Sequence, residues 1–229
     1  FTMPDVGRVL RGVSVPGQSV STLVAVEPIV TDNQEIGLEF DNGIFRGRVA
    51  YFESQADNGS RLRLNESGIF EVLRQRTEID GFELSFDYVI SSRISVGGNY
   101  ARTEARVDSD GDGRVDSDLD GLNIAPNRLN LYFQGDLTDK LSLRVQSSLL
   151  EDRDFNGPGA PDNANFDGFT LLDAIVSWKS EVGDFGLGID NLLNKDYVTY
   201  FSQVETGQRD DTFFAGVGRT INLSWRASF

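Results

Sequence analysis

The end of the chain alternates between apolar and polar positions with a period of two. The apolar parity of residues 215–229 is interrupted at Arg219 and otherwise consists of Ala215, Val217, Ile221, Leu223, Trp225, Ala227 and Phe229. The intervening positions hold glycine, threonine, asparagine, serine or arginine. Strict alternation is typical of a β-strand with one apolar and one polar face. A water-soluble domain rarely ends on an aromatic residue within such a strand, because chain ends fray unless they are tied down.

The same period recurs along the chain and predicts nine strands and no convincing helix. The expected strands are residues 33–41, 44–54, 76–90, 94–105, 127–135, 141–149, 169–179, 185–195 and 215–229. Residues 1–32 show no such pattern. Asp41-Asn42-Gly43, between the first two strands, is a strong signal for a tight hairpin turn.

The connections between these strands alternate in length. Short turns are expected at 41–43, 91–93, 136–140 and 180–184, and long loops at 55–75, 106–125, 153–168 and 197–214. Consecutive antiparallel strands place all the short turns at one edge of the sheet and all the long loops at the other. This asymmetry is typical of outer-membrane β-barrels, whereas the loops of a β-sandwich need not sort by length.

The amino-acid composition limits the partners and the kinds of site that this chain can have. The net charge of −15 disfavours nucleic acid as a partner. The absence of cysteine and histidine excludes thiolate or imidazole metal sites and histidine-based catalytic triads within this chain. No run of about 18 apolar residues is present to form a transmembrane helix. A membrane-spanning barrel strand needs only about ten alternating residues, so a membrane protein is not excluded.

Several segments resemble one known family. The runs "GIDNLLNKDYVTYF" (188–201) and "GVGRTINLSWRASF" (216–229) closely resemble the C-terminal end of TonB-dependent outer-membrane receptors, especially siderophore receptors. The segments "FTMPDVGRVLRG", "VEPIVTDNQEIGLEF" and "RTEIDGFELSFDYVIS" resemble earlier parts of the same family, in the same order.

The resemblance implies a fold and a function. The fold class is all-β, an antiparallel up-and-down transmembrane β-barrel segment of about nine strands from a larger barrel, expected to have 22 strands. Residues 1–229 would be the C-terminal part of the barrel, and the family's plug domain is not expected in this chain. The receptor would lie in the outer membrane of a Gram-negative bacterium and import a ferric siderophore. Its partners would be membrane lipid, the TonB energy-coupling complex through the absent plug, and the barrel-assembly machinery through Phe229.

An acidic loop offers a candidate metal site. In "DSDGDGRVDSDLDG" (108–121), Asp108, Asp110, Asp112 and Asp116 occupy positions 1, 3, 5 and 9 of a calcium-binding loop, and Gly113 occupies the turn position 6. Leu119 stands at position 12, where the bidentate glutamate belongs. The alternative is a solvated acidic loop, since acidic runs commonly have no ligand.

The sequence offers little for catalysis, so no enzyme activity and no required cofactor are expected. Candidate ligand contacts in the long loops are Tyr200, Phe201, Arg209 and Arg153, because aromatic and guanidinium groups suit a bulky, partly anionic iron chelate. The alternative is that these side chains only pack the loops. Two other functions stay open: a receptor of the same architecture for cobalamin or a glycan, and a soluble calcium-stabilised β-sandwich adhesin.

Overall fold

The structure is a computed structural model that describes residues 29–64, 70–155, 165–205 and 214–227. One antiparallel sheet contains β1 (Asp32–Asp41), β2 (Phe45–Leu64), β3 (Phe70–Ser91), β4 (Ile94–Val107), β5 (Ser117–Asp118), β6 (Arg128–Asp136), β7 (Leu141–Leu150), β8 (Phe169–Ser180), β9 (Gly183–Asp190) and β10 (Thr220–Arg226). Every strand except β5 pairs with its neighbour in chain order, and the two-residue β5 pairs with β4. The expected up-and-down topology of nine strands is confirmed.

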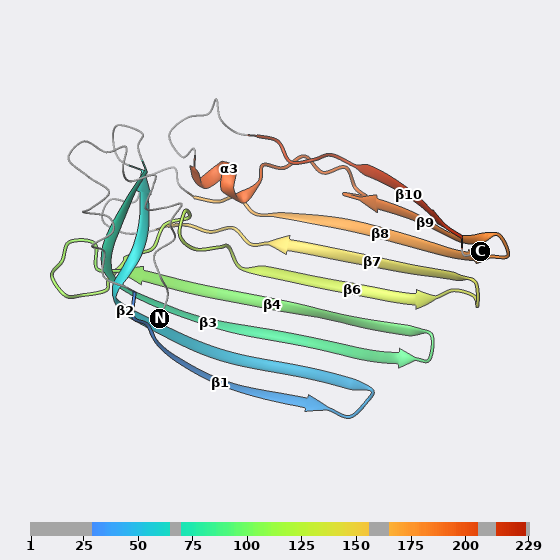
Figure 1. Ribbon diagram of the computed structural model, residues 1–229, viewed down its shortest axis with the longest axis horizontal. Helices are drawn as coiled ribbons and strands as arrows, with labels where there is room; N and C mark the ends of the chain where they lie inside the picture. Colours follow the sequence, from blue (N-terminus) through green and yellow to red (C-terminus); the bar gives the residue numbers. More distant parts are fainter. Residues whose placement is uncertain (1–28, 65–69, 156–164, 206–213, 228–229) are drawn as a thin grey trace.

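The two kinds of connection lie at opposite ends of the sheet, as the sequence predicts. Figure 1 shows the four tight turns, β1–β2, β3–β4, β6–β7 and β8–β9, at one end and the long connections at the other. The first turn follows from its residues: Gly43 has a φ of +82°, and its N–H donates to Asp41 Oδ1 at 2.8 Å. Glycine adopts this left-handed conformation without steric cost.

Two predictions about the long connections are wrong. The expected loop 55–75 is mostly strand, because β2 and β3 continue as a paired ribbon to Leu64 and Phe70, with a bulge between Ala56 and Gly59. The expected loop 197–214 contains a short helix, α3 (Tyr200–Glu205). At the C-terminal side, β9 ends at Asp190 rather than at 195, and β10 is shorter than the expected 215–229.

The sheet has one apolar and one polar face. Strand register aligns Leu38, Val49, Leu84, Tyr100, Leu129 and Leu149 in one continuous row. The next row on the opposite face contains Glu39, Arg48, Ser85, Asn99, Asn130 and Ser148. Apolar side chains on the first face are widely exposed, with Leu38 at 76% and Leu223 at 81%. This apolar surface needs a non-aqueous environment or a partner to cover it.

Aromatic rings gather on the apolar face near the tight turns. Trp178 stacks on Phe185 with ring centres 5.4 Å apart, and Phe185 in turn lies 6.5 Å from Trp225. The indole N–H of Trp225 donates to the carbonyl of Val182 in the β8–β9 turn at 3.1 Å. Rings with one polar edge suit the boundary between hydrocarbon and water.

The buried core lies at the opposite end, among the long connections. It consists of Ala105, Val107, Leu119, Ile124, Phe155, Phe166, Phe169 and Val204. These residues come from the ends of β4 and β8 and from three different connections, so the loops pack on one another. In the part of the chain that the structure describes, no helix is long and apolar enough to cross a membrane.

Candidate functional site

Residues 119–127, which connect β5 to β6, are here called the hub loop because other connections are bonded to them. The guanidinium of Arg61, from the β2–β3 ribbon, reaches Asp120 Oδ2 at 3.1 Å. Both side chains are largely buried, at 11% and 15% exposure. Asp120 also accepts the backbone N–H of Leu122 at 3.2 Å. The Arg61–Asp120 ion pair therefore joins the β2–β3 ribbon to the hub loop. Asp120 also stabilises the turn of the hub loop, because it accepts the N–H of Leu122.

Arg153, a predicted ligand contact, is bonded within the protein. Its Nη1 donates to the backbone carbonyls of Thr103 at 2.9 Å and of Ala125 in the hub loop at 3.1 Å. Its Nη2 lies 3.6 Å from Glu104, and its guanidinium lies 5.5 Å from the ring centre of Phe155. With the side chain only 13% exposed, these contacts join the segment after β7 to β4 and to the hub loop.

Tyr200, a second predicted contact, holds helix α3 to the same loop. Its hydroxyl donates to the carbonyl of Ile124, and its ring packs edge-on against Phe166 with centres 4.8 Å apart. Burial of the phenol raises the pKa of Tyr200 to about 12. The hydroxyl is therefore a neutral hydrogen-bond donor throughout the physiological range.

The structure brings two of the four predicted ligand residues together. Tyr200 and Arg153 bind adjacent carbonyls of the hub loop, at Ile124 and Ala125. Phe201 is 60% exposed at the surface of α3. Arg209 lies outside the described residues. Whether any of the four touches a ligand stays a prediction.

The acidic loop after β4 gathers three of its four predicted metal ligands. Carboxylate oxygens of Asp108, Asp110 and Asp112 lie within 4.8 Å of one another, and Asp116 is not among them. Gly113 has a φ of +89°, which agrees with its predicted turn position. Both oxygens of Asp108 accept backbone N–H groups, from Gly111 at 2.7 Å and Gly113 at 3.0 Å. Calcium takes six to eight oxygens, so binding here needs further ligands and stays a prediction.

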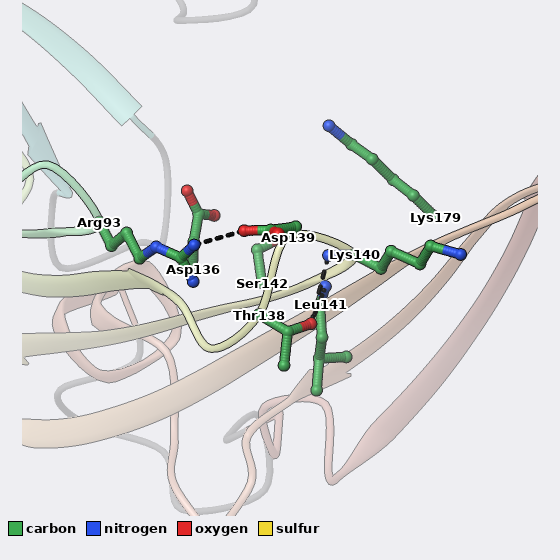
Figure 2. Close-up of a pocket in the computed structure, with 8 residues that line it drawn as sticks. All are labelled: Arg93, Asp136, Thr138, Asp139, Lys140, Leu141, Ser142 and Lys179. Atoms are coloured by element: carbon green, nitrogen blue, oxygen red, sulfur yellow. Dashed lines mark hydrogen bonds and ion pairs between the residues drawn. The ribbon is translucent and has the colours of Figure 1, made fainter.

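A small hollow of about 110 Å³ lies at the tight-turn end (Figure 2). Arg93 forms an ion pair with Asp139 across it, and Thr138 Oγ1 accepts the N–H groups of Lys140 and Leu141. Lys179 of β8 adjoins the same turn, and its backbone N–H donates to the carbonyl of Lys140 at 2.8 Å. The hollow is too small for a bulky chelate, and its contacts stabilise the β6–β7 turn.

A larger hollow of about 400 Å³ lies on the sheet's polar face, and sequence reasoning missed it. Its lining includes the small side chains of Ser85, Asn99 and Ala101 and the cationic side chains of Arg48 and Arg128. Asn130 Nδ2 donates to Asn99 Oδ1 at 2.8 Å, while its Oδ1 accepts from Ser148 and Arg128. The alternating pattern predicted a polar face, but only the register across five strands shows which polar residues adjoin.

Comparison with known protein families decides what this sheet belongs to. A family model described as "TonB dependent receptor-like, beta-barrel" matches residues 1–192 of the chain. The chain belongs to this family. TonB-dependent receptor barrels lie in the outer membrane of Gram-negative bacteria, so this sheet is a section of an outer-membrane barrel wall. Its apolar face then meets lipid, its polar face lines the lumen, its tight turns face the periplasm and its long connections face the outside.

Among individual TonB-dependent receptors, the ferric aerobactin receptor of Escherichia coli is 26% identical over 245 aligned residues, covering 97% of this chain and 31% of that receptor. The rhizobactin receptor of Rhizobium meliloti (strain 1021) is 28% identical over 211 residues, covering 87% and 26% respectively. The chain thus spans less than a third of the length of either receptor.

Solved structures share the fold of this TonB-dependent receptor segment. The copper transporter OprC superposes with a TM-score of 0.76 at 17% identity, covering 96% of this chain and 34% of that one. The pyoverdine receptor FpvA of Pseudomonas aeruginosa PAO1 gives 0.65 at 17% identity, covering 89% and 30%. The soluble β-sandwich considered from the sequence is therefore wrong, because these neighbours and the family are barrels.

Proposed function

We propose that the receptor to which this wall segment belongs imports a ferric siderophore across the outer membrane. The observation that carries this proposal is the similarity of 97% of the chain to part of a ferric aerobactin receptor. The rhizobactin receptor supports the same substrate class. A transport role needs no bond making or breaking by this chain, in keeping with the absence of histidine and cysteine.

The steps follow the family. The external connections, with the plug, capture the chelate. The TonB complex acts on the plug from the periplasmic side, and the chelate then passes along the lumen. This segment would supply wall, lumen lining and loops, and energy coupling would belong to the plug. Phe201, exposed on α3, places an aromatic ring at the external end, where capture would occur, whereas the polar groups of Tyr200 and Arg153 are bonded to the hub loop.

The proposal is tested with the full-length receptor in cells that lack their own siderophore receptors. Iron-55-labelled ferric aerobactin should bind to these cells and enter them, and entry but not binding should stop when TonB is deleted. Cobalamin and oligosaccharide uptake measured in the same strain provide the contrast. Accumulation of either of these, with no binding of ferric aerobactin, would contradict the proposal and favour a receptor of the same architecture for another substrate.

A further inference from the structure

The hub loop is bonded to three segments that are distant in sequence. Arg61 lies 59 residues from Asp120, Tyr200 lies 76 residues from Ile124, and Arg153 lies 28 residues from Ala125. These bonds reach the β2–β3 ribbon, helix α3 and the segment after β7. The hub loop therefore touches every long connection at the external end for which the structure describes residues.

The same loop supplies the apolar contacts between these segments. Leu119 and Ile124 belong to the core cluster, together with Phe155 and Phe166 from the connection after β7 and Val204 from α3. A Cβ on Gly121 would lie 2.5 Å from Val204 Cγ1, so α3 sits directly on the hub backbone. Buried apolar contacts shared between segments make their unfolding cooperative.

The bonds are of kinds whose loss is costly. Arg61 and Asp120 are both largely buried, so removing one partner leaves the other charge in a poorly hydrated site. The hydroxyl of Tyr200 and the guanidinium of Arg153 satisfy backbone carbonyls that would otherwise lose their hydrogen bonds. By contrast, Arg74 donates to the carbonyl of Asn58 within the ribbon.

We propose that the hub loop couples the ribbon, the segment after β7 and helix α3 into one cooperative external unit, which opens and closes as a whole. A perturbation at the ribbon then alters α3, because the hub loop contacts both segments. Because such coupling is reciprocal, a perturbation at α3 must in turn alter the ribbon. The proposal concerns the ligand-free receptor and does not depend on which chelate it binds.

Amide hydrogen exchange of the full-length receptor in lipid nanodiscs tests the coupling. In Arg61→Met, exchange should rise by about tenfold in residues 56–64 and 70–77 and also in residues 198–205, since all of them open with the unit. Tyr200→Phe removes one hydroxyl and should raise exchange in the same two regions. The matched control, Arg74→Gln, removes a ribbon guanidinium of similar chemistry and should raise exchange in the ribbon alone.

The outcomes separate a coupled unit from independent loops. If Arg61→Met changes exchange only in the ribbon, or Tyr200→Phe only in α3, the loops open independently and the proposal is wrong. If Arg74→Gln disturbs α3 as strongly as Arg61→Met, the effect is general loosening, which also overturns it. Asp120→Asn, which keeps the side-chain shape, serves in place of Arg61→Met should that variant fail to assemble.

Discussion

The orientation of the last strand predicts that a charged side chain on its apolar face lowers the free energy of unfolding, by an amount that depends on the depth of the residue in the membrane. Trp225, Leu223 and Ile221 are 60%, 81% and 62% exposed, and they pair with Phe185, Leu187 and Ile189 on that face. Asn222 and Ser224 lie between them on the polar face, opposite Gly188 and Gly186. Arginine substitutions at these positions therefore compare lipid with lumen within one short strand.

The magnitude follows from the geometry. Trp225 is bonded to the β8–β9 turn, which places it at the membrane boundary. Each step of two residues advances about 7 Å along the strand and, at a tilt of about 45°, about 5 Å in depth. An arginine costs about 2–4 kcal/mol at the midplane of an apolar band about 25 Å tall, and about 0–1 kcal/mol at its edge. We expect a loss of about 1–2 kcal/mol for Leu223→Arg and about 2–3 kcal/mol for Ile221→Arg.

The assay is guanidinium unfolding of the full-length receptor from phospholipid vesicles, followed by tryptophan fluorescence. Asn222→Arg and Ser224→Arg should change the free energy of unfolding by less than about 0.5 kcal/mol, as exposed substitutions usually do. If the two polar-face variants lose more stability than Ile221→Arg and Leu223→Arg, the inside and outside of the wall have been assigned the wrong way round.

Four further predictions concern single sites. Deletion of Phe229 should lower the amount of receptor assembled in the outer membrane, measured by surface labelling; unchanged assembly would remove any role for this residue in recognition by the assembly machinery. Calorimetry should detect calcium binding with a dissociation constant of roughly 10⁻⁴–10⁻³ M that is lost in the Asp110→Asn/Asp112→Asn variant. Equal heats from the wild-type protein and the variant would indicate a solvated acidic loop that binds no ion. Ultraviolet titration of wild type against Tyr200→Phe should show one tyrosine ionising near pH 12 rather than near 10, with stability lost only as the pH rises through that interval. Gly81→Ala should lower the free energy of unfolding by about 1–3 kcal/mol in the same assay, because the added Cβ would lie 2.3 Å from the ring of Phe52 and 2.7 Å from the carbonyl oxygen of Arg102. An unchanged free energy would mean that these neighbours move aside without cost.

Hydrophobic periodicity predicts the membrane part of this fold well, because lipid on one side and water on the other impose a period of two. Leu129, Leu131 and Phe133 alternate with Asn130 and Tyr132, and the predicted strand 127–135 agrees closely with β6. The alternating signal is lost beyond the membrane, where no face of a strand has to meet lipid. Residues 55–64 read as a polar loop, although backbone pairing with β3 makes them strand.

The external contacts could be predicted only in part. The sequence indicated Arg153 and Tyr200 as candidate ligand contacts in long connections; the structure places Tyr200 in α3 within such a connection, and nothing in the sequence indicated the partners of either residue. Those partners are backbone carbonyls at Ile124 and Ala125, and a carbonyl is present at every residue, so no sequence pattern marks it. Arg61 was not recognised as a structural contact, because the sequence predicted a loop where the structure has β2.

The use of carbonyls as acceptors has a consequence for how this surface can evolve. Phages, bacteriocins and antibodies that attack a bacterium select for changed side chains on exposed receptor loops. At Ala125, whose side chain is exposed, the residue can change without loss of the bond, because Arg153 holds only the main chain; the side chain of Ile124, by contrast, is buried in the core. Gly121 is an exception, since any side chain there would collide with Val204. The exposed position 125 can therefore present a new side chain to an attacker while the hydrogen bond beneath it is kept.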